Sequence, residues 1–345
     1  MLTSLSTFLF AIKSLLPLEV AITFGVILFA LSWVRPRRIV SFPQVGLRRS
    51  ILLWAGTAGS CAIALTATVA SALNVAVPDA SGFDGWWRRP APLVVATVVI
   101  VAAAVALRRT PLPAPGERAI APRRAWYTFA PPALLWTAGI VGALTALIAG
   151  WQIAIATTAP AAGPFFGNVP DHSTLPLYMS FNSGFGYVAG AGWPNQLATV
   201  LALLLAAVVL VTVLRTDANR PLFARASALS VRPERESTAR LLTLLLLAGL
   251  TATAGAVLMH VGAVGTSLVG LDGSVVSGDA SSPRVLIDGG YSAVARPMNL
   301  VGYLLQGAGV ALALRLAVDS VRAARAGRAA PPVAAAAAAL SGASR

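Results

Sequence analysis

The sequence predicts an all-α integral membrane protein with seven transmembrane helices. Of its 345 residues, 57% are apolar and only 11% are charged. The mean hydropathy of +0.77 is far above the value for a water-soluble globular protein. Apolar runs of at least about 17 residues, the shortest length that spans a bilayer as a helix, recur along the chain. We therefore expect lipid, not water, to surround most of the chain.

The lipid environment also explains why these runs should be helices. A backbone in hydrocarbon must satisfy its own hydrogen bonds, and continuous Leu, Val and Ala stretches do this within a helix, whereas barrel strands would alternate with polar residues. The runs place the seven helices at residues 15–33, 51–77, 91–107, 129–156, 197–214, 241–269 and 298–314. Residues 1–318 are thus expected to form one transmembrane domain. No small-x-small cleavage pattern follows the first span, so we expect it to be retained.

The arginines alternate between successive connections, and this alternation predicts the orientation. The first, third and fifth links carry most of them: Arg35, Arg37, Arg38, Arg48, Arg49, Arg108, Arg109, Arg118, Arg123, Arg124, Arg215, Arg220, Arg225, Arg232, Arg235 and Arg240. The second, fourth and sixth links hold only Arg88, Arg89, Arg284 and Arg296. Because basic links stay in the cytoplasm, the N-terminus should lie outside and the C-terminus in the cytoplasm.

Two external connections and the C-terminal tail complete the predicted organisation. Residues 157–193 and 270–296 are long enough to form a small extracytoplasmic cap. The second of these contains Asp272-Gly273 and Asp288-Gly289 around short β-prone pieces, which is typical of a β-hairpin. Residues 319–345 are rich in Ala, Pro and Arg, and we expect this cytoplasmic tail to be disordered.

The residue inventory excludes most membrane enzymes. Lys13 is the only lysine, which excludes a P-loop lysine and a Schiff-base lysine in the seventh span. Cys61 is the only cysteine, and two histidines are too few for a multi-histidine metal site. No His-Glu-x-x-His motif occurs. The sequence therefore predicts no catalytic residues, no cofactor and no metal site.

Polar residues inside the predicted spans or at their beginning gather in the outer half of the membrane. They are Glu19, Gln152, Asn195, His260, Asn299 and Gln306. The centre of each predicted span holds no Asp, Glu, Lys, Arg or His, which argues against an ion-coupled carrier. Since polar groups facing lipid are costly, these six residues form a hypothetical outer vestibule. The alternative is that they are scattered interfacial residues.

The functional expectation is a non-catalytic polytopic protein: a scaffold, a sensor or a regulatory membrane subunit. The alternative is a permease or permease subunit for a small solute, and an intramembrane enzyme comes last. A continuous polar path would favour the permease, and a dry inner half would favour the first class. The net charge of +14 lies beside the membrane and indicates lipids, or a protein partner at the Arg-rich cytoplasmic face, and not nucleic acid. The Ala- and Arg-rich composition suggests a bacterial cytoplasmic membrane.

Overall fold

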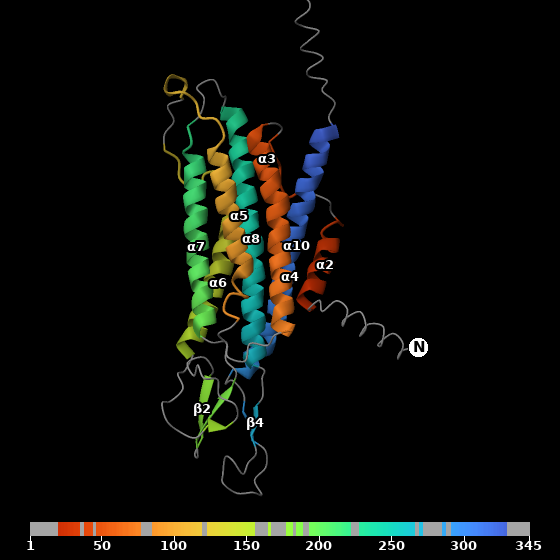
Figure 1. Cartoon of the computed structure of the whole chain (residues 1–345), viewed down its shortest axis with the longest axis vertical. Coiled ribbons are helices and arrows are strands. Elements are labelled where there is room, and N and C mark those ends of the chain that lie inside the picture. Colours follow the sequence, from red (N-terminus) through yellow and green to blue (C-terminus); the bar gives the residue numbers. More distant parts are fainter. Residues whose placement is uncertain are drawn as a thin grey trace, which may run out of the picture.

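The computed structural model describes most of the predicted transmembrane domain. The described residues are 20–34, 38–43, 46–76, 85–118, 123–155, 165–166, 177–181, 184–188, 193–221, 228–265, 269–271, 285–287 and 291–329. Long helices run roughly side by side along the longest axis of the molecule (Figure 1). The helices are α2 (Val20–Leu31), α3 (Leu47–Trp54), the π-helix η1 (Ala55–Gly59), α4 (Ser60–Ala76), α5 (Ala91–Arg108), the 3-10 helix η2 (Pro115–Glu117), α6 (Pro132–Ile155), α7 (Trp193–Ala218), α8 (Ala228–Gly265) and α10 (Ser292–Ala329).

Six segments of the described chain are long and apolar enough to cross a membrane. They are Leu47–Leu73, Ala91–Arg108, Pro132–Ala154, Asn195–Ala218, Val231–Ala263 and Ala293–Ala326. They correspond to six of the seven predicted spans, and the chain has the helices of a multi-pass membrane protein. The remaining predicted span, 15–33, overlaps α2, of which 12 residues are described. A seventh crossing therefore stays a prediction.

Helix α8 lies at the centre of the bundle, where it contacts α10, α5, α6 and α7 (Figure 1). The 18-residue apolar segment of α8 is 94% buried inside the protein, whereas that of α6 is only 17% buried. In a membrane, helices associate through close packing, because lipid tails are as apolar as leucine. The central position of α8 therefore requires surfaces that let its neighbours approach closely.

Glycines provide those surfaces along the contact between α8 and α10. A Cβ added to Gly255 would lie 2.2 Å from the backbone nitrogen of Gln306, and one added to Gly262 would lie 2.5 Å from that of Asn299. The same holds in reverse for Gly302, whose Cβ would lie 2.5 Å from the Met259 nitrogen. The backbones of the two helices therefore touch, as small-residue faces permit.

The small residues at the start of the second span serve the same purpose. A Cβ on Gly56 would lie 2.2 Å from the Ser320 hydroxyl oxygen of α10, and one on Gly59 would lie 2.4 Å from the Val99 side chain of α5. Both glycines belong to η1, where the helix widens locally into π-helical turns. The small residues from Ala55 to Ser60 thus let both α10 and α5 approach the second span closely.

Helix α10 continues further than the sequence pattern indicates. The predicted span stops at 314, but the helix runs to Ala329. Residues 319–329 are consequently helical, so the boundary of the predicted disordered tail was placed too early; residues 330–345 lie outside the described part. Continuation is explained by packing, because Leu316 and Ser320 are fully buried against neighbouring helices.

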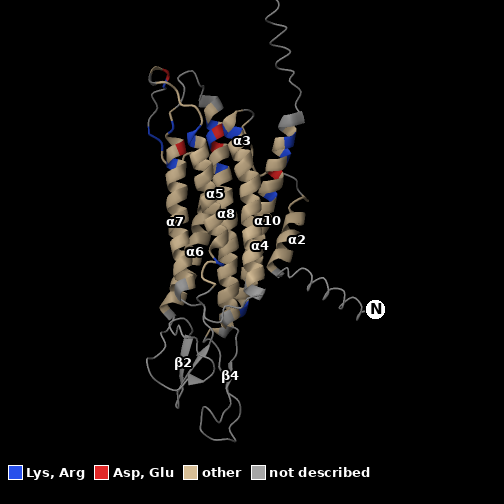
Figure 2. Cartoon of the chain, in the orientation of Figure 1, with Lys and Arg blue, Asp and Glu red and all other residues tan. Residues whose placement is uncertain are grey.

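Short strands lie at the end of the bundle opposite most of the charged residues that the structure describes (Figures 1 and 2). Strand β3 (Gly184–Val188) pairs in parallel with β1 (Phe165–Phe166) and antiparallel with β2 (Leu177–Phe181). Strand β4 (Val269–Leu271) pairs antiparallel with β5 (Val285–Ile287). The β4–β5 pair falls in the connection where a hairpin was expected, but most of that connection lies outside the described residues, so the cap stays a prediction.

Among the residues that the structure describes, the acidic residues and most of the arginines lie at the other end of the bundle, which we call the arginine-rich end (Figure 2). It comprises the starts of α3, α6 and α8 and the ends of α5, α7 and α10. The opposite end, which carries β2 and β4, is called the strand end. The separation of charge places the apolar helix bodies between two polar ends, as a bilayer requires.

Candidate functional site

The polar residues predicted from the sequence occupy the half of the bundle nearer the strand end. Gln152 of α6, Asn195 of α7 and Gln306 of α10 are buried, with exposed fractions of 4%, 0% and 2%. His260 and Asn299 are half-buried. Glu19 lies outside the described residues. Burial of three amides supports the argument that such groups avoid lipid.

Some of these residues are brought together and others are not. The Asn299 amide donates a hydrogen bond of 2.8 Å to the carbonyl of Met259, the neighbour of His260 in α8. The backbone of Gln306 in α10 packs against Gly255, which lies in α8 as His260 does. Neither of the two pockets described below is lined by any of the predicted residues. A common vestibule therefore stays a prediction.

Tyr291, directly before α10, links this region to α6. Its hydroxyl donates a 3.1 Å hydrogen bond to the Val261 carbonyl, and its ring meets that of Trp151 edge-on with centroids 5.0 Å apart. Burial raises the pKa of the Tyr291 hydroxyl, and the side chain of Gln152 acts in the opposite direction. The aromatic pair thus connects α6 to the contact between α8 and α10.

Two arginines that the sequence analysis assigned to an external link are buried in the same half of the bundle. Arg88 and Arg89 are 7% and 2% exposed, and they lie in the turn at residues 85–90 that leads into α5. Arg89 Nη2 lies 2.9 Å from Nδ1 of His260. The length of α5 could have revealed this position: 18 residues span about 27 Å, short for a full crossing, so the preceding turn must enter the bundle.

At the arginine-rich end, several arginines bind the ends of helices. Arg220 donates to the carbonyls of Leu107 and Thr110, where α5 ends, and Arg235 donates to those of Ala218 and Arg220, where α7 ends. The last carbonyls of a helix have no partner within it, and a guanidinium satisfies several at once while matching the helix dipole. Part of the positive charge therefore stabilises the chain itself.

Charge pairs at this end also hold the termini of other helices. Arg48 of α3 forms a 2.7 Å salt bridge with Asp217 of α7 and donates to the Thr238 hydroxyl of α8. Burial lowers the pKa of the Arg220 guanidinium, the nearby Arg48 lowers it further and Asp217 opposes both. A guanidinium remains charged even so.

The extension of α10 places an ion pair inside the bundle. Arg315 and Asp319 lie 3.7 Å apart, each with 4% of its side chain exposed, and Asp319 accepts a 2.9 Å hydrogen bond from the Ile39 backbone. Trp33 lies under the guanidinium groups of Arg315 and Arg322, at 3.6 and 4.0 Å from its ring centroid. The span predicted from the sequence ended at residue 314 and therefore did not include Arg315 and Asp319.

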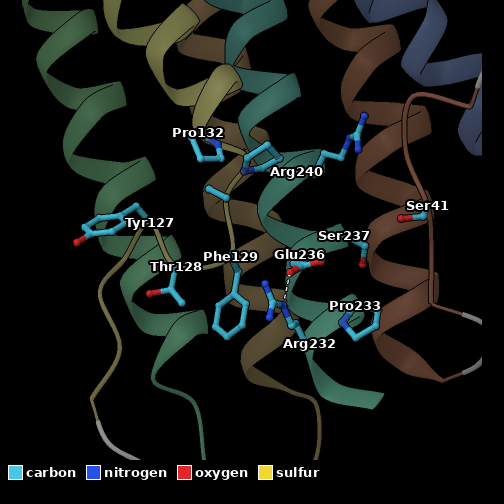
Figure 3. A pocket seen from close by; sticks show the side chains of 12 residues that line it. Ser41, Tyr127, Thr128, Phe129, Pro132, Arg232, Pro233, Glu236, Ser237 and Arg240 are labelled. Carbon is cyan, nitrogen blue, oxygen red and sulfur yellow. Dashed lines mark hydrogen bonds and ion pairs between the residues drawn. The ribbon is translucent and has the colours of Figure 1, made fainter. Parts of the chain in front are cut away.

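A pocket of about 620 Å³ opens at the arginine-rich end between the start of α6 and the first turns of α8 (Figure 3). It is lined by Ser41, Tyr127, Thr128, Phe129, Ala130, Pro131, Pro132, Arg232, Pro233, Glu236, Ser237 and Arg240. Arg232 and Glu236 form a 2.7 Å salt bridge within it. The pocket thus combines cations, hydroxyls and aromatic rings.

A second, apolar cavity of about 390 Å³ lies between α5, α6, α7 and α8. Small residues of α6 form one wall: Ala138, Gly139, Gly142, Ala143 and Ala146. Leucines and valines of α7, together with Leu246 and Leu250 of α8, form the other walls. The cavity offers packing surface and little polar chemistry.

Comparisons with known proteins identify no relative. No protein-family model matches this chain, and neither a curated protein nor a solved structure is significantly similar to it. Functional inference therefore depends on the geometry described above.

Proposed function

We propose that this protein is a non-catalytic membrane sensor or regulatory subunit, and not a solute permease. The observation that supports the proposal is that the first apolar part of α8 is buried on all its faces. Every residue from 241 to 248 is buried, and eight residues of a helix cover all of its faces, since a turn takes 3.6 residues. The one polar side chain in this stretch, Thr243, donates to the Ala239 carbonyl of its own helix. This stretch offers no polar lining to a passing solute.

The proposal assigns a receiving role to the buried polar groups near the strand end and an output role to the arginine-rich end. The Ala- and Arg-rich composition favours a bacterial cytoplasmic membrane. By the positive-inside rule the arginine-rich end faces the cytoplasm, and with the seven spans expected from the apolar runs the N-terminus lies outside. Exposed arginines at that end, such as Arg109, Arg118 and Arg215, leave charge available to an acidic protein partner. Helix α8 connects the two polar regions directly, so its movement would transmit a signal.

One observation favours the permease as the second candidate. Gln196 is fully buried in α7, and within the described part of the chain neither its Oε1 nor its Nε2 has a hydrogen-bond partner. A buried amide without partners costs about 1–3 kcal/mol, which a bound polar solute would recover. A permease would still require a polar path past residues 241–248.

Thiol accessibility in intact membranes separates the two candidates. Single cysteines replace Thr243, Leu246 or Leu250 in a Cys61→Ala background, and a small, membrane-impermeant methanethiosulfonate reagent is applied from each side. The proposal predicts no reaction at any of the three. Arg232→Cys is the matched control, because its side chain is 73% exposed and must react from one side.

Long incubation makes this test independent of the resting conformation. A permease that opens briefly would expose the inner half of α8 in some fraction of its cycles. Because the reagent reacts covalently, labelled protein would accumulate with each opening. Labelling at two of the three buried positions, with the control reacting normally, would contradict the proposal and support the permease.

A further inference from the structure

The pocket at the start of α6 and α8 carries an inference independent of the proposed function. Its position along the chain relates it to the membrane surface. Arg240 directly precedes the buried apolar stretch that begins at Leu241, and Pro132 is the first residue of the apolar helix α6. Both boundaries separate polar from apolar sequence, so the pocket lies where lipid headgroups are found.

The charge around the pocket is positive. Arg232 and Arg240 line it, with Glu236 between them on the same helix. Residues four apart lie on one side of a helix, so the three side chains follow one another along α8. Glu236 neutralises Arg232 through their 2.7 Å salt bridge, which leaves Arg240 as the uncompensated cation among the charged residues that line the pocket.

Two further guanidinium groups lie close to the ring of Phe129, which forms part of the pocket wall. The ring of Phe129 lines the pocket, and the guanidinium carbons of Arg124 and Arg235 lie 5.2 and 5.5 Å from its centroid. Neither arginine lines the pocket, yet both add positive potential at this short distance. Tyr127, 58% exposed, stands at the rim as interfacial aromatic residues do.

We propose that this pocket binds the phosphate headgroup of an anionic membrane lipid. Arg240 supplies the main charge-assisted contact to the phosphate, and Glu236 limits the affinity by holding Arg232 and by repelling the anion. The hydroxyl of Ser41, on the opposite side of the pocket from Tyr127 and Thr128 in Figure 3, can donate to a further headgroup oxygen, whereas the Thr128 hydroxyl donates to the Ala125 carbonyl. The occupant is a lipid because the pocket lies at the level where the apolar helices begin.

Native mass spectrometry of the purified full-length chain tests the proposal. The protein is titrated with phosphatidylglycerol, and the apparent dissociation constant of the first bound lipid is measured. A cation near the membrane surface contributes about 1 kcal/mol to binding an anionic lipid, so Arg240→Gln should weaken binding about fivefold. Glu236→Gln should tighten it by a similar factor, because it frees Arg232 and removes the repulsion.

The opposite signs of the two variants exclude a merely structural effect, since a loss of folding cannot tighten binding. Arg215→Gln is the matched control: it makes the same change in net charge at an exposed arginine outside the pocket. We expect it to bind phosphatidylglycerol as the parent protein does. An equal loss in Arg215→Gln and Arg240→Gln would indicate diffuse surface charge and would overturn the site.

Two further arms test the source of the phosphate. Phosphatidylcholine, whose headgroup has no net charge, should bind more weakly and should not distinguish Arg240→Gln from the parent protein. Glycerol 3-phosphate should not displace bound phosphatidylglycerol at equal concentration. Efficient displacement would overturn the lipid assignment in favour of a soluble phosphate compound, and stronger binding of an acidic peptide than of phosphatidylglycerol would do so in favour of a protein partner.

Discussion

Replacing Gly255 by alanine should separate the two central helices. The added Cβ would lie 2.2 Å from the nitrogen and 2.6 Å from the Cα of Gln306, both backbone atoms that no side-chain rotation can move. An ordinary contact is about 3.5 Å, so α8 and α10 must move apart locally by roughly 1 Å. A displacement of this size sacrifices a quarter to a half of the attraction between the facing atoms.

The expected loss of stability follows from this geometry. Overpacking of a well-packed core typically costs about 1–3 kcal/mol, and packing is the main force between membrane helices. Gly150→Ala in α6 is the matched control, because a Cβ there meets nothing within 4 Å. Alanine in an open helical position stabilises by about 0.4–1 kcal/mol. The same gain applies at position 255 and cancels in the comparison, so the two variants should differ by the overpacking cost of about 1–3 kcal/mol.

Thermal unfolding in detergent, followed by intrinsic tryptophan fluorescence, measures the difference. At about 2 °C per kcal/mol, the Tm of Gly255→Ala should lie at least about 2 °C below that of Gly150→Ala. Equal Tm values would refute the close backbone contact between α8 and α10.

Three other predictions concern orientation, helix ends and the buried histidine. In a Cys61→Ala background, cysteines at positions 84, 171 and 279 should react with an impermeant reagent on intact cells, whereas those at 118 and 232 should react only after permeabilisation. Position 232 is used because its side chain is exposed, whereas that of Arg235 is buried. Reversed access at these positions would overturn the orientation. Arg235→Gln removes the donors that satisfy the end of α7 and should lower stability by about 1.5–3 kcal/mol, while Arg215→Gln should leave the Tm unchanged; equal effects would contradict the role of Arg235 in holding that helix end. His260→Ala removes the 2.9 Å contact with Arg89 and should lower the Tm by an amount that corresponds to about 1–3 kcal/mol, and an unchanged Tm would show that the pair contributes nothing to the fold.

Local chemistry explains what could be predicted from the sequence. A long apolar run has few stable conformations in lipid, so the helices at 51–77, 91–107, 129–156, 197–214, 241–269 and 298–314 were recognisable without tertiary information. Each of the six overlaps a long apolar helix of the structure. Charge was informative for a similar reason, because arginines concentrate in the links where transfer across the membrane is costly.

What each polar residue contacts could be decided only by the tertiary structure. Arg88 and Arg89 are indistinguishable from loop arginines in sequence, and only the packing of the 85–90 turn buries them next to His260. Arg315 and Asp319 follow an apolar run that is already long enough to cross the membrane. The helix continues past them because Leu316 and Ser320 are buried against neighbouring helices. The pocket around Arg240 unites residues about 100 positions apart in α6 and α8. Hydropathy is a property of a segment, whereas burial and ion pairing depend on which faces meet, and the glycine contacts between helices determine those faces.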